Sequence, residues 1–256
     1  RYWGRHAPIL FPIVGRLKDN QYTYAGKTYQ MTQHGFARDN DFEVVEATYN
    51  KAVLRLTQNP ETLKKYPFEF GLDATFELVD HQIKVFLKVT NPSKDQELPF
   101  SIGAHPGFNV PLIKDGISVF ENYFIRVAPK GKYQQIPLKP PYSDPSNIKA
   151  IDLDKPLELK HELFNSDAIV LQLNGKETTA MLANANNDHG VAVTVLNAHY
   201  LGIWSPYPKK APFVCLEPWW GIADTVDADG NLNNKYDITH LKPNDSFTAK
   251  YEISFF

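Results

Sequence analysis

One carboxylate in this chain follows directly on an apolar segment and is a candidate proton acceptor. The apolar residues 213–216 predict a short buried strand that ends at Glu217, just before a proline. Alternation along this strand places Glu217 on the same face as Phe213 and Cys215. A buried carboxylate is rare unless it is paired or functional, and Trp219 close by is suited to stack on a sugar ring. In the alternative interpretation, a buried arginine pairs with Glu217 and the indoles belong to the core.

Further side chains that could take part in catalysis or binding occur at the predicted ends of other strands. Each has a structural explanation of its own: a lone histidine is often a satisfied structural residue, an aspartate can end a turn, and an arginine can lie on the surface with a buried stem. Their shared position favours a common site, because loops converge at strand ends. These candidates are Arg16, His34, Arg38, His105 and Asp167.

The sequence does not predict a metal or a cofactor. Zinc sites usually have clustered ligands such as H-x-x-x-H or C-x-x-C, whereas His34 and His105 are isolated and Cys215 is the single cysteine. The sequence also contains no G-x-S-x-G motif, no P-loop and no dinucleotide fingerprint. We therefore expect chemistry that uses side chains alone.

Composition narrows the class of partner. The 27 basic and 29 acidic residues are intermixed and give a net charge of −2, which provides no electrostatic case for nucleic acid or an anionic membrane. No apolar segment approaches the ~20 residues of a membrane helix. A single cysteine rules out an internal disulfide and favours a reducing compartment, so we expect a cytoplasmic location. We expect a small molecule as partner, and a monomer or homodimer.

Strand patterns dominate the chain, whereas helical periodicity is scarce and limited to Glu61–Tyr66 and Leu157–Phe164. Many short strands with few helices predict an all-β protein, a large antiparallel β-sandwich. No linker divides the sequence, so we expect one domain over residues 1–256. The further predicted strands are Phe42–Tyr49, Ala52–Thr57, Ala74–Val79, Gln82–Thr90, Ile117–Val127, Ala168–Leu173, Thr178–Leu182, Val191–Leu196 and Lys250–Phe256.

Five segments together resemble the aldose 1-epimerase (galactose mutarotase-like) family, in its LacX-like branch. The resemblance implies a galactose mutarotase-like supersandwich with a sugar site on a concave face. Family members usually have further N-terminal strands before the first of these segments, so we expect that this chain lacks them. The segments are W-G-R-H-A-P-I-L-F-P-I-V-G-R (3–16), Q-H-G-F-A-R-D (33–39), G-A-H-P-G-F-N-V-P-L (103–112), L-F-N-S-D-A-I-V-L (163–171) and C-L-E-P-W-W-G-I-A-D (215–224).

The resemblance also implies roles in interconverting the α and β anomers of a free aldohexose. His105 matches the general acid at the ring oxygen, and Glu217 matches the general base at the anomeric hydroxyl. The productive form then needs an ionised Glu217 and a protonated His105. Asp167 matches the residue that holds sugar hydroxyls, and His34 and Arg16 match residues near the anomeric end.

Three alternatives remain open at this stage. Arg38 belongs to an H-G-F-A-R form shared with hexose-6-phosphate mutarotase relatives, and a phosphate needs such cations. Glu217 and Asp167 are the pair of carboxylates that a glycosidase would use. A non-catalytic carbohydrate-binding protein is the third alternative, because a fold does not fix a function. The stacking role of Trp219 rests on its aromatic type alone.

Overall fold

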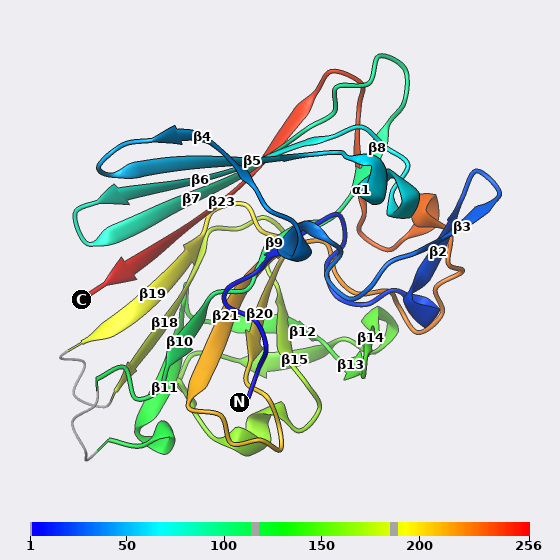
Figure 1. Ribbon diagram of the computed structural model, residues 1–256. Helices are drawn as coiled ribbons and strands as arrows, with labels where there is room; N and C mark the ends of the chain where they lie inside the picture. Colours follow the sequence, from blue (N-terminus) through cyan, green and yellow to red (C-terminus); the bar gives the residue numbers. More distant parts are fainter. Residues whose placement is uncertain (1, 114–117, 185–188) are drawn as a thin grey trace.

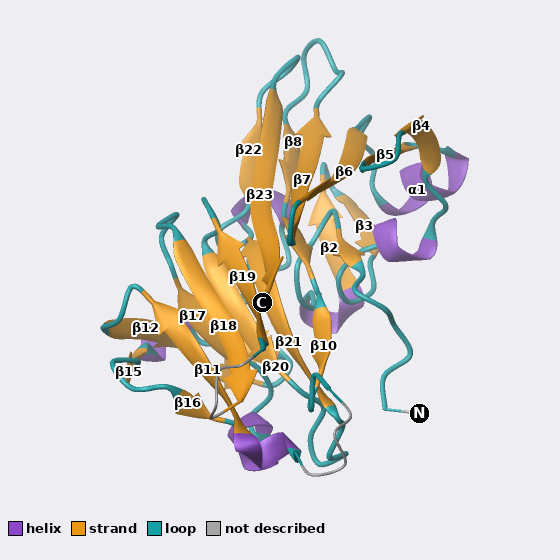
Figure 2. Cartoon of the chain, turned by 90° about the vertical axis from the view of Figure 1, so that its left-hand side faces the viewer, coloured by secondary structure: helices purple, strands orange, loops and turns teal. Residues whose placement is uncertain are grey.

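Two large antiparallel sheets make up most of the computed structural model, which describes residues 2–113, 118–184 and 189–256 (Figure 1). Within those residues, one sheet has nine strands in the order β16-β11-β18-β19-β23-β7-β6-β5-β4. The other has eight, in the order β1-β9-β21-β20-β17-β12-β15 with β10 also paired to β21. Figure 2 shows how few and short the helices are, so the predicted all-β class is confirmed.

The strands and helices of the described residues have the following bounds. The nine-stranded sheet contains β4 (Glu43–Ala47), β5 (Lys51–Thr57), β6 (Gly71–Val79), β7 (Gln82–Thr90), β11 (Tyr123–Ala128), β16 (Leu157–Glu158), β18 (Thr178–Asn184), β19 (Gly190–Val195) and β23 (Ser246–Phe255). The eight-stranded sheet contains β1 (Ile9–Leu10), β9 (Ile102–Ala104), β10 (Gly107–Asn109), β12 (Lys132–Ile136), β15 (Lys149–Asp152), β17 (Ile169–Gln172), β20 (Tyr200–Trp204) and β21 (Phe213–Trp220). Two-stranded ribbons are β2 (Gln21–Tyr24) with β3 (Lys27–Gln30), β13 (Leu138–Lys139) with β14 (Tyr142–Ser143), and β8 (Leu98–Phe100) with β22 (Thr239–Leu241). Helical segments are α1 (Pro60–Lys65) and short 3₁₀ turns at Lys18–Asn20, Ala37–Asp39, Phe120–Asn122, Pro145–Asn147, His161–Phe164 and Leu232–Asn234. None of these helices is long and apolar enough to cross a membrane.

The main apolar core contains buried side chains from both large sheets. Leu72 and Val89 of the nine-stranded sheet belong to the same cluster as Leu201 and Leu216 of the eight-stranded sheet. A second, smaller cluster includes Val170, which alternates with the core residues of β17 and therefore lies on the other face of the eight-stranded sheet. That sheet is consequently covered on both faces, and polar groups on its outer face have apolar surroundings.

Strand β21 shows this two-sided burial most clearly. Val214 and Leu216 belong to the main core, whereas Cys215, Glu217 and Trp219 project from the opposite face, because successive strand residues alternate. The predicted shared face of Cys215 and Glu217 is therefore confirmed. β20 pairs along one edge of β21, and β9 and β10 pair along the other, so Glu217 lies in the interior of a sheet.

The prediction that the strand ends at Glu217 is wrong, because β21 continues through Pro218 to Trp220. Proline has no N–H to donate to a sheet and is normally found at edges or irregularities. Here β10 pairs with β21 only as far as Cys215, and β9 begins its pairing at Trp219. Pro218 thus lies where one edge of β21 lacks a continuous partner, and the proline is tolerated inside the strand.

The predicted helix at 61–66 is confirmed within one residue by α1, whose N-terminus the side chain of Asn59 caps. The prediction of a helix over 157–164 is wrong. Leu157 pairs with Ile125 of β11, and only the end of the segment forms a 3₁₀ turn. Pairing with a neighbouring strand overrides a weak helical preference. The predicted strand 117–127 has its first residue outside the described residues, and β11 starts only at Tyr123.

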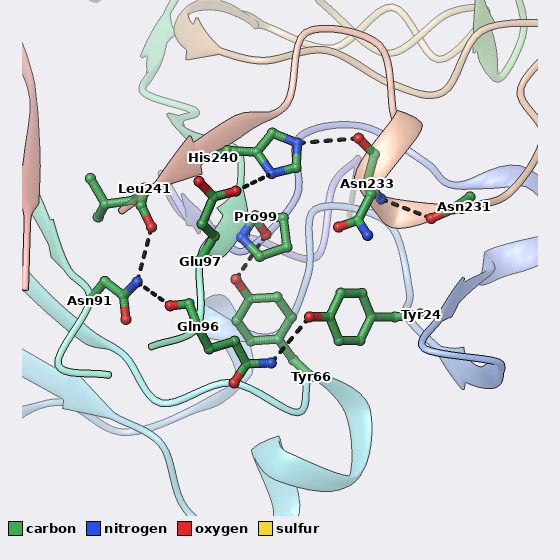
Figure 3. Close-up of polar contacts among 10 residues, drawn as sticks. All are labelled: Tyr24, Tyr66, Asn91, Gln96, Glu97, Pro99, Asn231, Asn233, His240 and Leu241. Atoms are coloured by element: carbon green, nitrogen blue, oxygen red, sulfur yellow. Dashed lines mark hydrogen bonds and ion pairs between the residues drawn. The ribbon is translucent and has the colours of Figure 1, made fainter. Parts of the chain in front are cut away.

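A buried polar cluster fixes the chain as it enters β8, upstream of β9 (Figure 3). Asn91 is 1% exposed and donates from Nδ2 to the carbonyl oxygens of Gln96 (2.8 Å) and Leu241 (2.9 Å). Tyr66 donates its hydroxyl to the carbonyl of Pro99 at 2.9 Å. The side-chain amide of Gln96 in turn donates to the hydroxyl of Tyr24 at 3.1 Å. These bonds connect the segment that leads into β8 and β9 to β22 and to the end of α1.

We expect Asn91→Ala to lower the free energy of unfolding by about 2–3 kcal/mol, because the substitution leaves buried carbonyl oxygens without their donor. Urea titration followed by circular dichroism measures this change. Asn50→Ala is the matched control, since Asn50 is only half-buried and its side-chain amide donates one long bond (3.3 Å) to the carbonyl of Leu78. Equal losses in the two variants would contradict the structural importance of the buried cluster.

Candidate active site

The structure brings all seven predicted site residues into one pocket of about 340 Å³. This pocket lies on the outer face of the eight-stranded sheet, where Glu217 and Trp219 project from β21. The chain therefore folds so that side chains between residues 16 and 219 share a single cavity. The seven are Arg16, His34, Arg38, His105, Asp167, Glu217 and Trp219.

A histidine and a glutamate form a direct pair in this pocket. His105 Nε2 lies 3.1 Å from Glu217 Oε2, and the two side chains are 8% and 1% exposed. His105 directly follows β9 and therefore shares the face of Gly103, the residue that pairs with Trp219 of β21. The predicted position of this histidine at a strand end is confirmed. Two adjacent strands thus hold one acid and one base within proton-transfer distance.

Burial decides the charge of this pair. Desolvation, together with the nearby positive charge of Arg38, lowers the pKa of His105 to about 3. Desolvation also raises the pKa of Glu217 well above its ordinary value, and the negative charge of Asp167 adds to that shift. In the free pocket both shifts favour the uncharged forms, a neutral imidazole beside a protonated carboxyl group. Together they keep one transferable proton.

Polar groups without partners are concentrated in the pocket. Among the described residues, nine buried side-chain nitrogen or oxygen atoms lack a hydrogen-bond partner, and six of them belong to residues that line this cavity. Buried polar atoms are normally satisfied, so such a concentration marks a place built to bind a polar molecule. The six are Nε of Arg16, Nε of Arg38, Nδ1 of His105, Oγ of Ser143, Oε2 of Glu217 and Nε1 of Trp219. Oε2 of Glu217 is 3.1 Å from Nε2 of His105, but the two groups are not aligned as a hydrogen bond.

His34 is held by the backbone of the segment that carries Arg16. Its Nδ1 accepts a hydrogen bond from the N–H of Gly15 at 3.1 Å, and its own N–H donates to the Gly15 carbonyl at 2.7 Å. Burial lowers the pKa of His34 well below its ordinary value, with further contributions from His105 and Arg38. A neutral imidazole that accepts at Nδ1 carries its proton on Nε2. His34 therefore offers the pocket a hydrogen-bond donor.

The glycine after His34 is required by the backbone. Gly35 has φ +69°, and a Cβ at this position would lie 2.2 Å from the carbonyl oxygen of Phe11. Only glycine lets residues 34–36 pack this closely on the strand segment at Phe11. The H-G pair in the sequence thus reflects a turn that aims the histidine.

Two guanidinium groups line the pocket, and a third lies nearby. Arg38 lies on the 3₁₀ turn Ala37–Asp39 with its side chain 14% exposed, and burial lowers its pKa. Arg16 contacts the side-chain oxygen of Gln33 at 3.2 Å. Arg5 does not line the cavity and pairs with Asp39. Two cations with unpartnered Nε atoms therefore face the cavity.

Trp219 is fixed by the sheet on which it lies. Its ring packs directly on Gly202 and Gly103. A Cβ at Gly202 would lie 2.7 Å from the ring, and a Cβ at Gly103 would lie 2.9 Å from it. The residue is 7% exposed and lines the cavity. Close backbone approach at two neighbouring strands therefore seats the indole as a rigid wall.

Two other aromatic residues of the pocket were missed by sequence reasoning. Trp3 lies against His105 with ring centroids 4.6 Å apart, and Trp204 meets the same imidazole edge-on at 5.5 Å. Alternation along β20 would have placed Trp204 on the face of Gly202. Trp3 lies outside any strand, so no periodic signal marks it.

This fold, with a buried acid–base pair on its outer sheet face, agrees with the results of comparison to known proteins. The model of the family described as aldose 1-epimerase matches residues 1–254. The chain belongs to the aldose 1-epimerase family. Membership in that family indicates an isomerase of the epimerase class that acts on a sugar.

Individual relatives lie in the LacX-like part of the family. Protein LacX of Lactococcus lactis subsp. lactis is 29% identical over 262 residues, covering 99% of this chain and 86% of that protein. A galactose mutarotase related enzyme from Lactobacillus acidophilus is 42% identical with a TM-score of 0.96, over 100% of this chain and 84% of the other. A galactose mutarotase-like protein from Lactobacillus casei is 34% identical with a TM-score of 0.89, covering 100% and 86%.

The two histidines with opposite pKa shifts give a prediction for the site. At pH 6.5 we expect His105 to be neutral, because burial lowers its pKa to about 3. We expect His199 to be mostly protonated, because the hydrogen bond from its Nδ1 to Asp237 (2.8 Å) raises its pKa. NMR titration of the imidazole carbons measures both, and assignment uses a His105→Asn and a His199→Gln variant. Titration of His105 near pH 6.5 would contradict the neutral pair.

Proposed function

We propose that this protein is an aldose 1-epimerase that interconverts the α and β anomers of a free aldohexose. The observation that carries the proposal is the pair of His105 Nε2 and Glu217 Oε2, 3.1 Å apart on the wall of a pocket of about 340 Å³. Anomer exchange needs one acid and one base that act on two oxygens of the same hemiacetal. These two groups supply both functions side by side.

The reaction opens and closes the sugar ring and conserves protons overall. A base removes the proton of the C1 hydroxyl while an acid delivers a proton to the ring oxygen, and the C1–O5 bond breaks. The C1–C2 bond then rotates, and the ring closes on the opposite carbonyl face as the two protons return. A positioned acid or base typically contributes ~10²–10⁴-fold. The proposal assigns Glu217 as the base for opening and His105 as the acid.

Proton transfer within the pair reconciles these roles with the burial of both groups. The free pocket favours neutral His105 and protonated Glu217. The two atoms are 3.1 Å apart but not aligned as a hydrogen bond, so the proton passes from the carboxyl group to the imidazole when a bound sugar aligns the pair and stabilises the charges. The net charge of the pair does not change in this step. In the neutral arrangement Glu217 is the acid and His105 is the base, and ring closure uses the pair in these exchanged roles.

The other pocket residues support binding and orientation of the sugar in this proposal. Asp167 accepts hydrogen bonds from sugar hydroxyls. Burial raises the pKa of its carboxyl group. His34 donates from Nε2 and Arg16 donates from its guanidinium near the anomeric end. Trp219 offers an indole face to the C–H groups of the ring. None of these roles needs a metal ion or a redox group.

Wider expectations accompany this proposal. The site draws on side chains from residue 16 to residue 219, so we propose that the chain works as one domain, although relatives extend further in sequence. The single cysteine, Cys215, is buried and unpaired, which suits a reducing compartment, and we propose the cytoplasm as the place of action. We propose a monomer or a homodimer.

We expect Glu217→Gln to lower the catalysed rate of mutarotation by ~10²–10⁴-fold, because the amide neither accepts nor returns the proton. The measurement is polarimetry of freshly dissolved α-D-galactose or α-D-glucose with and without the protein. His105→Asn is expected to show a loss of the same order. Far-ultraviolet circular dichroism establishes that each variant retains the fold.

Glu162→Gln is the matched control, because this glutamate is exposed and lies outside the pocket. Wild-type rates in the Glu217→Gln variant would overturn the assignment of the base. Hydrolysis of a disaccharide without anomer exchange would favour a glycosidase that uses Glu217 and Asp167. Saturable sugar binding with no acceleration would favour a non-catalytic carbohydrate-binding protein.

A hexose 6-phosphate is the second candidate substrate, and the two guanidinium groups of the pocket favour it. The Nε atoms of Arg16 and Arg38 are buried without a hydrogen-bond partner, and a phosphate accepts several charge-assisted hydrogen bonds at once. Burial and the charges of Arg5 and Arg16 lower the pKa of Arg38, and the carboxylate of Asp39, 4.0 Å from Nε, offsets this only in part, so a further anion would relieve the remaining repulsion.

If the phosphorylated sugar is the substrate, Arg38→Gln should raise KM for glucose 6-phosphate by ~10–100-fold and change KM for glucose little. This range corresponds to about 1.5–3 kcal/mol for a hydrogen bond to a charged group. Exchange NMR of the two anomers measures both substrates. Arg126→Gln is the matched control, because Arg126 lies on β11 over the ring of Phe124. Equal changes for both sugars would contradict phosphate recognition by Arg38.

A further inference from the structure

Cys215 is a buried thiol that the proposed reaction does not use, and it lies beside the acid–base pair. One potential ligand atom from each of His105, Cys215 and Glu217 lies within 4.8 Å of the other two. Cys215 and Glu217 are two residues apart on the same face of β21, and His105 directly follows the adjoining strand β9. The fold thus creates a cluster of sulfur, nitrogen and oxygen donors in which His105 is 110 positions before Cys215 in the sequence.

We propose that this cluster binds a thiophilic divalent cation such as Zn²⁺, and that the bound cation inhibits the protein by occupying the acid–base pair. The binding site itself depends only on the three side chains. The inhibition rests on the function proposed above. The cation is an inhibitor in this proposal and takes no part in anomer exchange.

The spacing of the three side chains suits a small tetrahedral ion. Bonds of about 2.0–2.3 Å from zinc to nitrogen, oxygen and sulfur place neighbouring ligand atoms roughly 3.5 Å apart. His105 Nε2 and Glu217 Oε2 are already at 3.1 Å, and no pair in the cluster exceeds 4.8 Å. Shifts on the order of 1 Å bring the remaining pairs, which are at most 4.8 Å apart, to that spacing. The pocket leaves a fourth position open to water.

Unpartnered atoms in the same place provide a second, independent observation. Glu217 Oε2 and His105 Nδ1 are buried and lack a hydrogen-bond partner. A carboxylate oxygen in that state gains most from a cation that replaces its proton. The cation would reach the pair from the cavity, which both residues line, and Cys215 would bind it from behind.

The mixed donor set also predicts which ions bind. A thiolate and an imidazole are ligands of Zn²⁺, whereas Mg²⁺ and Ca²⁺ prefer oxygen atoms alone. Binding replaces the proton of the thiol and the proton shared by His105 and Glu217, and both protons pass to solvent. No electron is transferred. A sugar and the cation compete for the same two groups, so inhibition is expected to be competitive.

Cobalt provides a test that is independent of enzymatic activity. Co²⁺ replaces Zn²⁺ in such sites, and a cobalt–thiolate bond gives a near-ultraviolet charge-transfer band. We expect one equivalent of Co²⁺ to produce this band in the wild-type protein and Zn²⁺ to abolish it. The band should be absent from Cys215→Ala and from Cys215→Ser, the second of which preserves the side-chain volume. Competition with a chromogenic chelator should show Zn²⁺ affinity at least ~10-fold weaker in both variants.

His240→Gln is the matched control for adventitious binding, because His240 lies 3.6 Å from Glu97 at the surface. This variant should keep the cobalt band and the zinc affinity. Absence of the band in the folded wild-type protein, or its persistence in both Cys215 variants, would overturn the proposed site. Binding without any effect on anomer exchange in an active protein would overturn the inhibition.

The same experiment separates this inference from the proposed function. If polarimetry shows anomer exchange but no cobalt band appears, only the metal site fails. If the band appears in a protein that does not accelerate anomer exchange, the metal site stands and the epimerase function fails.

Discussion

The structure depends on the alternation of side chains along β21, a strand in the interior of a sheet that is buried on both faces. Val214 and Leu216 hold the strand in the main core, and the same backbone presents Cys215 and Glu217 to the opposite face. A shift of one residue in register would exchange these two sets and place a carboxylate in the core. The free energy of core packing therefore positions the reactive groups, and the site needs no separate scaffold.

Burial on that outer face then decides the charges of the site. A solvent-exposed histidine and glutamate at this distance would form an ion pair, whereas here desolvation lowers the pKa of His105 and raises that of Glu217. The ionised pair that the productive form needs is therefore opposed by burial until a sugar binds. Apolar neighbours such as Trp219 and Ile222 contribute to this desolvation because they close the same pocket.

The sequence allowed the class of the fold and the membership of the pocket to be predicted, but not the details that tertiary contacts decide. Period-two patterns identified strands such as β7 and β19, because each buries one face along its length. Pro218 misled the prediction of the strand end, since the gap between β9 and β10 is invisible in sequence. Trp3 has no periodic signal, and its contact with His105 exists only in the folded chain.

The close approach of two glycines to Trp219 has a consequence for how this pocket can change. A side chain at Gly202 or Gly103 would collide with the indole, and a smaller residue at 219 would leave an unfilled gap against both strands. Any single substitution among the three is therefore costly, and only coordinated changes preserve the packing. Divergence of sugar preference in descendants of this protein should accordingly begin at lining residues of the β13–β14 ribbon, such as Leu138 and Pro141, which lie outside the strands that enclose the indole.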